Sequence, residues 1–469
     1  MELDSRKTLT SLWNGEEVAQ ATQGRLAGSF QASNVQIDSR IVEAGDLFIA
    51  IRGENNDGHN YLAQVKKREA AGLLVENSKG LTTPYIEVED GFTALWDLAK
   101  AARSRSSAKT TAITGSVGKT GTKELLIAAF SALGDTHGTI GNLNNHFGLP
   151  LTLARLPKTA AFSILEMGMS APEEIRPLST LGRPQVAIIT AIAAAHSEFF
   201  SSIKGIALAK SEIFDGIEPH GTAILNRDDD YFEFLKAQLR SRRPDCKLLT
   251  FGTGGAADAQ LISVDFDAKE NVQKVEASIG GKDIRYSLSL NGRHWALNSL
   301  AALLAVVAHN EDVERAACSL STVRPLPGRG EVTSPVLWNE KRFTLVDESY
   351  NASPAAVRAA IETLTLLAKT KRKILVLGDM RELGNESRKM HADLASCVAK
   401  NNVDLVFTSG SDSQALLEEL PSNMRGSHRA TAIELLEPII KEIENGDFVL
   451  IKGSLGSNMA PLVKALKER

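Results

Sequence analysis

The stretch TGSVGKT at residues 114–120 constrains the fold of this chain more than any other part of the sequence. An apolar run precedes it and a helical pattern over residues 119–133 follows it, which is the order of strand, loop and helix typical of phosphate-binding loops. Glycines let successive N–H groups point at one anion, and the helix adds its positive end. Lys119 supplies a cation for the outer phosphates, and the Thr120 hydroxyl suits Mg²⁺. The residues predicted to hold the phosphates are Gly115, Ser116, Val117, Gly118, Lys119 and Thr120.

The loop departs from the full GxxxxGK[ST] pattern, because Ile113 stands where the first glycine is expected. We interpret the stretch as a shortened phosphate loop. The alternative is a glycine-rich turn with a solvated lysine, but Gly-Lys-Thr at a helix start, directly after an apolar strand, favours phosphate binding.

Composition sets the scale of the fold. A chain of 469 residues suggests about three domains. With 43% hydrophobic and 23% charged residues, it has the make-up of an ordinary globular protein, and a net charge of -4 gives no reason to expect nucleic acid as a partner. We find neither a signal-peptide pattern nor an apolar run of membrane-spanning length, so we expect a cytoplasmic protein without membrane insertion. Three widely spaced cysteines indicate reduced thiols.

The pattern of strands and helices predicts an α/β protein with three domains. Residues 1–88 form a small α/β unit. Residues 89–323 alternate long strands and helices, which indicates a mostly parallel sheet around the phosphate loop with helices on both faces, and a small antiparallel hairpin set near 255–290. The text RPLPGRGE near residue 324 resembles a hinge, and residues 324–469 repeat the alternation as a Rossmann-like sheet. This last segment lacks GxGxxG, so we do not expect NAD.

Two strand ends carry candidate metal ligands. Glu166 ends the apolar strand AAFSILE, where a buried carboxylate needs a cation, and Mg²⁺ near the phosphate loop would provide it. A structural glutamate bonded to a helix N-terminus is the alternative. His196 follows the strand PQVAIIT, at the same sheet edge. A lone histidine is more often structural than a ligand, so spacing alone leaves its role open.

Lys210 is unusual in its predicted helix, residues 201–217, because apolar residues surround it. A lysine stem can reach out to solvent from such a position. If Lys210 faces a metal site, only its neutral or carbamylated form is favourable there, because a second cation would be repelled.

Other polar residues allow two interpretations each. Ser39 and Arg40 could receive a phosphate or a uracil edge, or form a capping turn with a surface ion pair. Asn142 belongs to an asparagine-rich loop that turn propensity alone could explain. Asn298 could meet a base edge or cap a neighbour, and Arg329 in the hinge could reach the nucleotide.

Taken in order, the motifs resemble a family. TGSVGKT, GNLNNHFGLP, EMG, the His196 loop, ALAKSEI, GRHWALN, PGRGE, DESYNASP and GDMRELG are similar to the Mur ligases of bacterial cell-wall synthesis, over nearly the whole chain. Within them, GNLNN, DESYNASP, GDMRELG and KGS are most similar to the member that joins D-alanyl-D-alanine to UDP-N-acetylmuramoyl-tripeptide. The resemblance implies a monomeric ATP- and Mg²⁺-dependent ligase that works through an acyl phosphate. Its first domain would bind the UDP end of the substrate, the central one ATP and the last one the dipeptide.

The resemblance also implies roles for single residues. Lys119 and Thr120 would hold phosphates and Mg²⁺, Glu166 and His196 would bind metal, and Lys210 would be the carbamylated lysine. Nucleotide contacts would come from Asn142 at the γ-phosphate, Asn298 at adenine, Arg329 at the phosphates and Asp347 at the ribose. Tyr350 and Asn351 would lie in a loop near nucleotide and dipeptide. This chain departs from the family pattern at Ala191, Ala193, Trp295 and Leu455.

Three other functions fit parts of the pattern. A related ligase, such as another Mur step or a folylpolyglutamate synthase, would share the ATP site and differ in residues 1–88. A kinase would release a stable phosphorylated product and form no amide. A nucleotide-dependent switch would bind ATP without substrate-stimulated hydrolysis, although Lys119, Thr120 and Glu166 argue against it.

Overall fold

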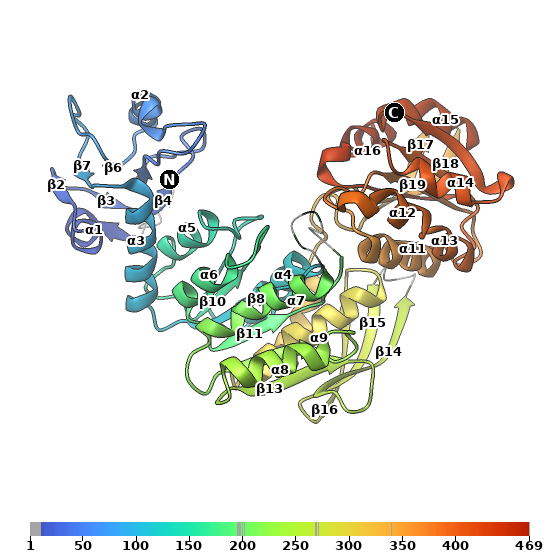
Figure 1. The fold of residues 1–469 in the computed structure, drawn as a ribbon, viewed down its shortest axis with the longest axis horizontal. Helices are drawn as coiled ribbons and strands as arrows, with labels where there is room; N and C mark the ends of the chain where they lie inside the picture. Colours follow the sequence, from blue (N-terminus) through green and yellow to red (C-terminus); the bar gives the residue numbers. More distant parts are fainter. Residues whose placement is uncertain are drawn as a thin grey trace, which may run out of the picture.

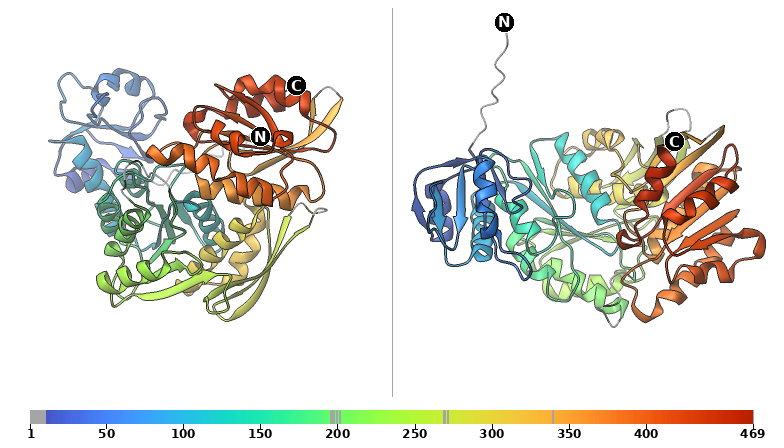
Figure 2. Two further views of the ribbon diagram at one scale, coloured as in Figure 1. Left: turned by 45° about the vertical axis from the view of Figure 1, so that its right-hand side comes forward. Right: turned by 90° about the horizontal axis from the view of Figure 1, so that it is seen from above.

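The computed structural model describes residues 11–194, 198, 200, 202–267, 270, 272–338 and 340–468. Three mixed α/β segments follow one another in space as they do in sequence, and the predicted fold class is confirmed. The blue N-terminal segment and the red C-terminal segment lie on either side of the green and yellow central segment (Figure 1). Seen from above, the three segments form a row (Figure 2). No helix in the described part of the chain is long and apolar enough to cross a membrane.

The N-terminal segment is built on a five-stranded sheet whose order is β2-β7-β6-β5-β4. All neighbours pair in parallel except β2 with β7. The strands are β2 (Arg25–Ala27), β4 (Asn34–Gln36), β5 (Asp46–Ile49), β6 (Gly72–Val75) and β7 (Tyr85–Glu87). A short pair, β1 (Trp13–Asn14) with β3 (Gln31–Ala32), and the helices α1 (Gly15–Thr22) and α2 (Leu62–Lys67) complete it.

Helix α3 (Gly91–Arg105) belongs to two hydrophobic cores at once. Leu95 and Leu98 pack in the N-terminal core, together with Trp13. Ala99, on another face of the helix, packs in the core of the central segment. The predicted boundary after residue 88 therefore falls just before a helix that both segments share, and the division into segments 1–88, 89–323 and 324–469 remains a proposal about independent units.

The central segment contains a nine-stranded sheet whose order is β16-β15-β14-β13-β12-β11-β8-β10-β9. From β9 to β14 the strands are parallel. They are β8 (Lys109–Thr114), β9 (Thr136–Gly138), β10 (Phe162–Glu166), β11 (Val186–Ile189), β12 (Thr222–Asn226), β13 (Lys247–Gly252), β14 (Ala259–Asp267), β15 (Val272–Ile279) and β16 (Lys282–Leu288).

Side chains alternate between two cores along these strands, as the two-residue period of a strand requires. Ile113, for example, packs on one face with Ile164, whereas Ala112 packs on the other. The first face is covered by α4 (Lys119–Ser131), α9 (Arg293–Ala308) and α10 (Val313–Ser319). The second is covered by α5 (Gly148–Ala154), α6 (Ile175–Gly182), α7 (Ile203–Lys210) and α8 (Phe232–Arg242). Because both faces are covered, the central strands are apolar on both sides.

The hairpin set predicted near residues 255–290 is an extension of the central sheet and not a separate unit. Strands β14, β15 and β16 pair antiparallel with one another. The link to the parallel part is short, because β13 and β14 pair only at Phe251 with Ala259 and at Gly252 with Gln260.

The helix predicted over residues 201–217 changes character at Lys210. Helix α7 ends there, and the 3-10 helix η2 (Ser211–Gly216) follows. The Ser211 hydroxyl donates to the Leu208 carbonyl (2.6 Å), a back-bond that tightens the turn. Periodicity alone does not separate the two helix types, so the sequence predicted one continuous helix.

The C-terminal segment has a six-stranded sheet of order β17-β18-β22-β19-β20-β21, parallel except for β17 with β18. Its strands are β17 (Glu331–Trp338), β18 (Lys341–Glu348), β19 (Lys373–Gly378), β20 (Leu405–Ser409), β21 (Arg425–Arg429) and β22 (Phe448–Lys452). Its helices are α11 (Pro354–Ala368), α12 (Ser387–Ala392), α13 (Ala395–Lys400), α14 (Gln414–Glu419), α15 (Leu436–Glu442) and α16 (Ala460–Lys467). The Rossmann-like arrangement agrees with the prediction.

His309, just after α9, ties that helix to the strand that carries the phosphate loop. Its Nε2 and the Thr111 hydroxyl form a hydrogen bond (2.9 Å), and burial lowers the pKa of His309 to about 4. The unfolded chain therefore takes up a proton near pH 6.5 and the folded chain only near pH 4, so this contribution to stability is complete above about pH 6.5 and is lost on acidification.

We expect the loss to reach roughly 3 kcal/mol at low pH. His309→Gln should therefore show a smaller fall in unfolding temperature than the parent protein between about pH 7 and about pH 4.5. Equal falls in the two proteins, measured by calorimetry, would contradict the assignment.

Candidate active site

The phosphate loop connects β8 to α4, and two of its glycines are required by geometry. Gly118 has φ +85°, a left-handed conformation that side chains disfavour, and it caps α4. A Cβ on Gly115 would lie 1.9 Å from the Thr190 hydroxyl oxygen, so that position has no room for a side chain. Thr190 itself donates to the Val117 carbonyl (2.6 Å). The residue after β11 thus supports the loop from the neighbouring strand.

Ala191 and Ala193, two departures from the family pattern, also contact the loop. The Ser116 N–H donates to the Ala191 carbonyl (2.8 Å), and the Ser116 hydroxyl donates to the Ala193 carbonyl (3.0 Å). Both contacts use the backbone, so alanine satisfies them.

Lys119 is the first residue of α4, and its Nζ donates to the Gly115 carbonyl within the loop (2.7 Å). Burial lowers the pKa of Lys119, the Glu166 carboxylate opposes this shift, and the Arg329 charge adds to it. An anion that enters the loop would stabilise the charged form of Lys119, because it compensates the positive charge. The arrangement is that of a phosphate site.

The Glu166 carboxylate lies at the end of β10 and is 1% exposed. Its Oε1 accepts hydrogen bonds from the Thr120 hydroxyl (3.2 Å) and from the Asn144 amide (2.8 Å). Its Oε2 is buried and has no hydrogen-bond partner. A buried carboxylate oxygen without a partner is costly, and a hard cation beside it would remove the cost.

The residues present therefore fit Mg²⁺. Glu166 and Thr120 would hold the ion, and nucleotide phosphates and water would supply its remaining oxygen ligands. Among the described residues no cluster of three or more histidine, cysteine, aspartate or glutamate side chains forms a metal cage. Mg²⁺ is commonly bound by one or two protein oxygens together with substrate phosphates, so a cage is not needed.

Lys210 is 1% exposed and ends α7. Burial lowers the pKa of Lys210 well below its usual value, and the nearby Lys119 charge lowers it further. The side chain has no hydrogen-bond or ion-pair partner in the described part of the chain, which favours a neutral amine. The predicted metal ligand His196 lies outside the described residues.

Trp295 and Asn298 on α9 lie directly against α4. A Cβ on Gly118 would be 3.1 Å from the Asn298 side-chain oxygen, which brings Asn298 to the phosphate loop. A Cβ on Gly121 would be 2.6 Å from the Trp295 ring. The tryptophan that departs from the family pattern therefore depends on a glycine at position 121.

Gly121→Ala is expected to cost roughly 1–3 kcal/mol of stability, because the new methyl group overlaps the Trp295 ring. Trp295→Leu should offset much of the loss, so the two substitutions should not be additive. Gly254→Ala is the matched control, since open space surrounds Gly254. Thermal unfolding of the four variants measures the coupling, and additive losses would contradict it.

The hinge brings three more predicted residues together. The Arg329 guanidinium lies over the Tyr350 ring, 4.1 Å from its centroid, and Tyr350 N–H donates to the Gly328 carbonyl (3.1 Å). Asp347 accepts the Gly330 N–H through its carbonyl (2.8 Å). A Cβ on Gly330 would lie 3.8 Å from the Trp295 indole nitrogen, so the hinge lies against α9, the helix that also contacts the phosphate loop.

The remaining predicted residues lie further out. Asn351 is exposed, and its carbonyl accepts from the buried Lys452 (2.9 Å). Asn142 is exposed in the loop after β9. Arg40 is exposed and its guanidinium contacts Asp38 (2.7 Å), whereas Ser39 is buried. Both residues belong to the N-terminal segment, and a role of Ser39 and Arg40 in substrate binding stays a prediction.

Sequence reasoning did not single out two contacts that shape this site. Asn144 orients Glu166, and Thr190 supports Gly115. Asn144 belongs to the asparagine-rich stretch GNLNN. That stretch predicted a polar loop but did not indicate that Asn144 contacts Glu166. Leu455, another departure, is 70% exposed.

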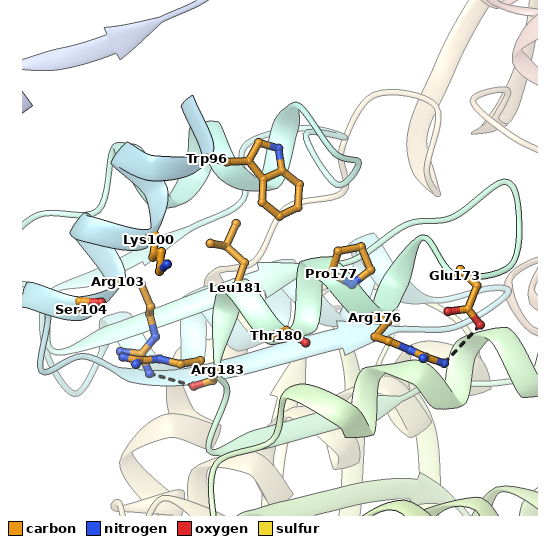
Figure 3. A pocket seen from close by; sticks show the side chains of 10 residues that line it. All are labelled: Trp96, Lys100, Arg103, Ser104, Glu173, Arg176, Pro177, Thr180, Leu181 and Arg183. Carbon is orange, nitrogen blue, oxygen red and sulfur yellow. Dashed lines mark hydrogen bonds and ion pairs between the residues drawn. The ribbon is translucent and has the colours of Figure 1, made fainter. Parts of the chain in front are cut away.

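A cavity of about 500 Å³ lies between α3 and α6, and no phosphate-loop residue lines it (Figure 3). Its three arginines are engaged locally: Arg176 pairs with Glu173 (3.2 Å), Arg183 pairs with Glu218 (3.5 Å), and Arg103 donates to the Arg183 carbonyl (2.8 Å). It therefore differs from the phosphate site, where a carboxylate oxygen lacks a partner. The lining residues are Trp96, Lys100, Arg103, Ser104, Glu173, Arg176, Pro177, Thr180, Leu181 and Arg183.

Comparison with known proteins bears on all three segments. Family models match at residues 31–101 (Mur ligase family, catalytic domain), 113–306 (Mur ligase middle domain) and 328–455 (Mur ligase, glutamate ligase domain). The UDP-N-acetylmuramoyl-tripeptide--D-alanyl-D-alanine ligase of Bacillus subtilis (strain 168) is 32% identical over 465 residues, 97% of this chain and 98% of that protein. This chain belongs to the Mur ligase family. The Escherichia coli (strain K12) ligase of the same name is also 32% identical, over 98% of this chain and 97% of its own length.

Solved structures of Mur ligases agree. MurF from Acinetobacter baumannii matches with a TM-score of 0.86 and 29% identity, covering 97% of this chain and 99% of that one. MurF from Thermotoga maritima, in complex with ADP, matches with a TM-score of 0.78 and 27% identity, covering 93% and 97%. The Mur ligase architecture thus extends over nearly the whole chain.

Proposed function

We propose that this Mur ligase joins D-alanyl-D-alanine to UDP-N-acetylmuramoyl-tripeptide in the cytoplasmic synthesis of peptidoglycan precursors, and that it acts as a monomer. The reaction consumes ATP and releases ADP and phosphate. Full-length similarity to ligases of that name supports the substrates. The observation that supports the chemistry is the unpartnered Glu166 Oε2 beside Thr120 and the phosphate loop.

Activation is needed because a carboxylate and an ammonium group do not condense in water. In the first step a carboxylate oxygen of the tripeptide attacks the γ-phosphorus of ATP, the bond to the bridging oxygen breaks, and ADP leaves. In the second step the dipeptide amine attacks the acyl carbon, phosphate leaves with the bonding electrons, and the nitrogen loses a proton. The products are an amide, ADP and phosphate.

The chain's own residues would act mainly on charge and position. Lys119 would neutralise the phosphoryl oxygens, and Glu166 with Thr120 would hold Mg²⁺, which supplies further positive charge when bound. Arg329 at the hinge would contact the phosphates as the C-terminal segment closes. Such closure would bring the amine to the acyl phosphate and exclude water.

Product analysis tests the proposal. The protein is mixed with ATP, Mg²⁺, UDP-N-acetylmuramoyl-tripeptide and D-alanyl-D-alanine, and products are identified by mass spectrometry. We expect UDP-N-acetylmuramoyl-pentapeptide, ADP and phosphate. A stable phosphorylated tripeptide would indicate a kinase, amide formation only with another amino acid would indicate a related ligase, and ATP binding without turnover would indicate a switch. Each of these results would overturn the proposal.

A further inference from the structure

Helix α4 carries a second lysine, Lys123, one turn after Lys119, and it is completely buried. Its Nζ forms an ion pair with Glu124 (2.7 Å) and donates to the Gly141 carbonyl (3.2 Å). Burying a lysine is costly even when it is paired, and a methionine of similar size would fill the space at lower cost. The charge therefore needs an explanation other than packing.

The loop that Lys123 reaches, residues 139–145, holds Glu166 from two sides. Thr139 accepts the Glu166 N–H through its hydroxyl oxygen (3.0 Å), and the Asn144 amide donates to Glu166 Oε1 (2.8 Å). The Asn144 carbonyl in turn accepts the Gly168 N–H (2.8 Å). The loop conformation therefore sets which carboxylate oxygen of Glu166 is bonded and which stays unpartnered.

The outer half of this loop is a turn, closed by a hydrogen bond from the Leu143 N–H to the Ile140 carbonyl (3.2 Å), and its tip at residues 140 and 141 lies at the surface. Ile140 is 63% exposed, and Gly141 has φ +58° with open space around the position of a Cβ. The Gly141 carbonyl nevertheless receives a hydrogen bond from Lys123. A charged donor makes a stronger hydrogen bond to a carbonyl than a neutral one, so Lys123 fastens the outer half of the loop to α4.

We propose that Lys123 is a positioning residue for the metal site. By holding loop 139–145 it keeps Asn144 on Glu166 Oε1 and leaves Oε2 available to Mg²⁺. Lys123 does not touch the nucleotide, because its side chain is fully covered. The inference rests on the proposed function, since it assumes that Glu166 serves an ATP-bound Mg²⁺.

The test compares nucleotide affinity with and without Mg²⁺. Binding of a non-hydrolysable ATP analogue is measured by calorimetry over a series of Mg²⁺ concentrations. Lys123→Met should raise the Mg²⁺ concentration needed for half-maximal effect by about tenfold, as expected for loss of a partner that orients a ligand. Affinity for the analogue without Mg²⁺ should stay unchanged, because the phosphate loop is intact. Glu124→Gln is the matched control, since it leaves the bond from Lys123 to Gly141 in place.

A folded Lys123→Met protein with parental Mg²⁺ dependence would overturn the positioning role. An equal loss of affinity without Mg²⁺ would also overturn it, because the defect would then lie in the phosphate loop. If the methionine variant does not fold, Lys123→Gln removes the charge and shortens the side chain, and the same outcomes apply. The binding measurement does not depend on product formation, so failure of the proposed function is detected separately in the product assay.

Discussion

Replacement of Lys119 with alanine is expected to lower the rate of ADP release, with all substrates present, by at least about a thousandfold. The reason is electrostatic. Lys119 is half-buried at the start of α4, and its Nζ already lies 2.7 Å from the Gly115 carbonyl, so it is held where phosphoryl charge develops. Water cannot replace it there at comparable strength, because a cation that the loop already holds in position needs no reorganisation during the reaction.

The matched control for Lys119 is Lys236→Ala on α8, which removes a partly exposed lysine that pairs with the exposed Glu233 (3.1 Å) and lies 5.8 Å from the centroid of the Phe232 ring. We expect that variant to keep parental activity, because an exposed ion pair contributes little. Coupled-enzyme detection of ADP gives both rates. Turnover of Lys119→Ala within tenfold of the parent would refute the role of the lysine.

Glu166→Gln is expected to reduce turnover by at least about a hundredfold and to weaken Mg²⁺ dependence of nucleotide binding. The amide has nearly the shape of the carboxylate and can still accept from Thr120, so the fold should persist. What it lacks is the negative charge that pairs with Mg²⁺ at the position of Oε2. Raising the Mg²⁺ concentration should restore part of the activity.

Asp447→Asn separates this effect from the general cost of changing a buried carboxylate. Asp447 is 2% exposed and pairs with Arg372 (3.1 Å) in the C-terminal segment. Its replacement should lower the unfolding temperature and leave the Mg²⁺ dependence unchanged. If both variants shift the Mg²⁺ dependence equally, the assignment of Glu166 as a Mg²⁺ ligand is wrong.

The sequence predicted those parts of the site that depend on local chemistry. Gly118, Lys119 and Thr120 are adjacent in the chain, and the strand before them and the helix after them are visible in the residue pattern. The role of Glu166 could be predicted as well, because it ends an apolar strand. A carboxylate buried there is costly unless a cation compensates its charge. The same pattern predicted both parallel sheets.

Contacts between distant loops were not predictable. Asn144 meets Glu166 because β9 and β10 pair at Phe162 with Thr136, and this register brings the loop after β9 over the end of β10. Thr190 meets Gly115 because β11 pairs with β8. The addition of the hairpin strands to the central sheet depends on two residue pairs. Periodicity predicts which residues are buried, but it does not predict which residues they contact.

The sharing of α3 between two cores limits how this protein can move. A fragment that began at residue 89 would expose Leu95 and Leu98 to water, so the first two segments are expected to travel as one body. The Trp13 indole donates to the Ala154 carbonyl (2.8 Å), and this hydrogen bond further connects the N-terminal and central segments. We expect the C-terminal segment to rotate relative to the other two about the proline- and glycine-rich hinge at residues 324–330. The N-terminal and central segments would thus hold the acid substrate and the nucleotide as one rigid body. Rotation of the C-terminal segment would bring the incoming amine to them.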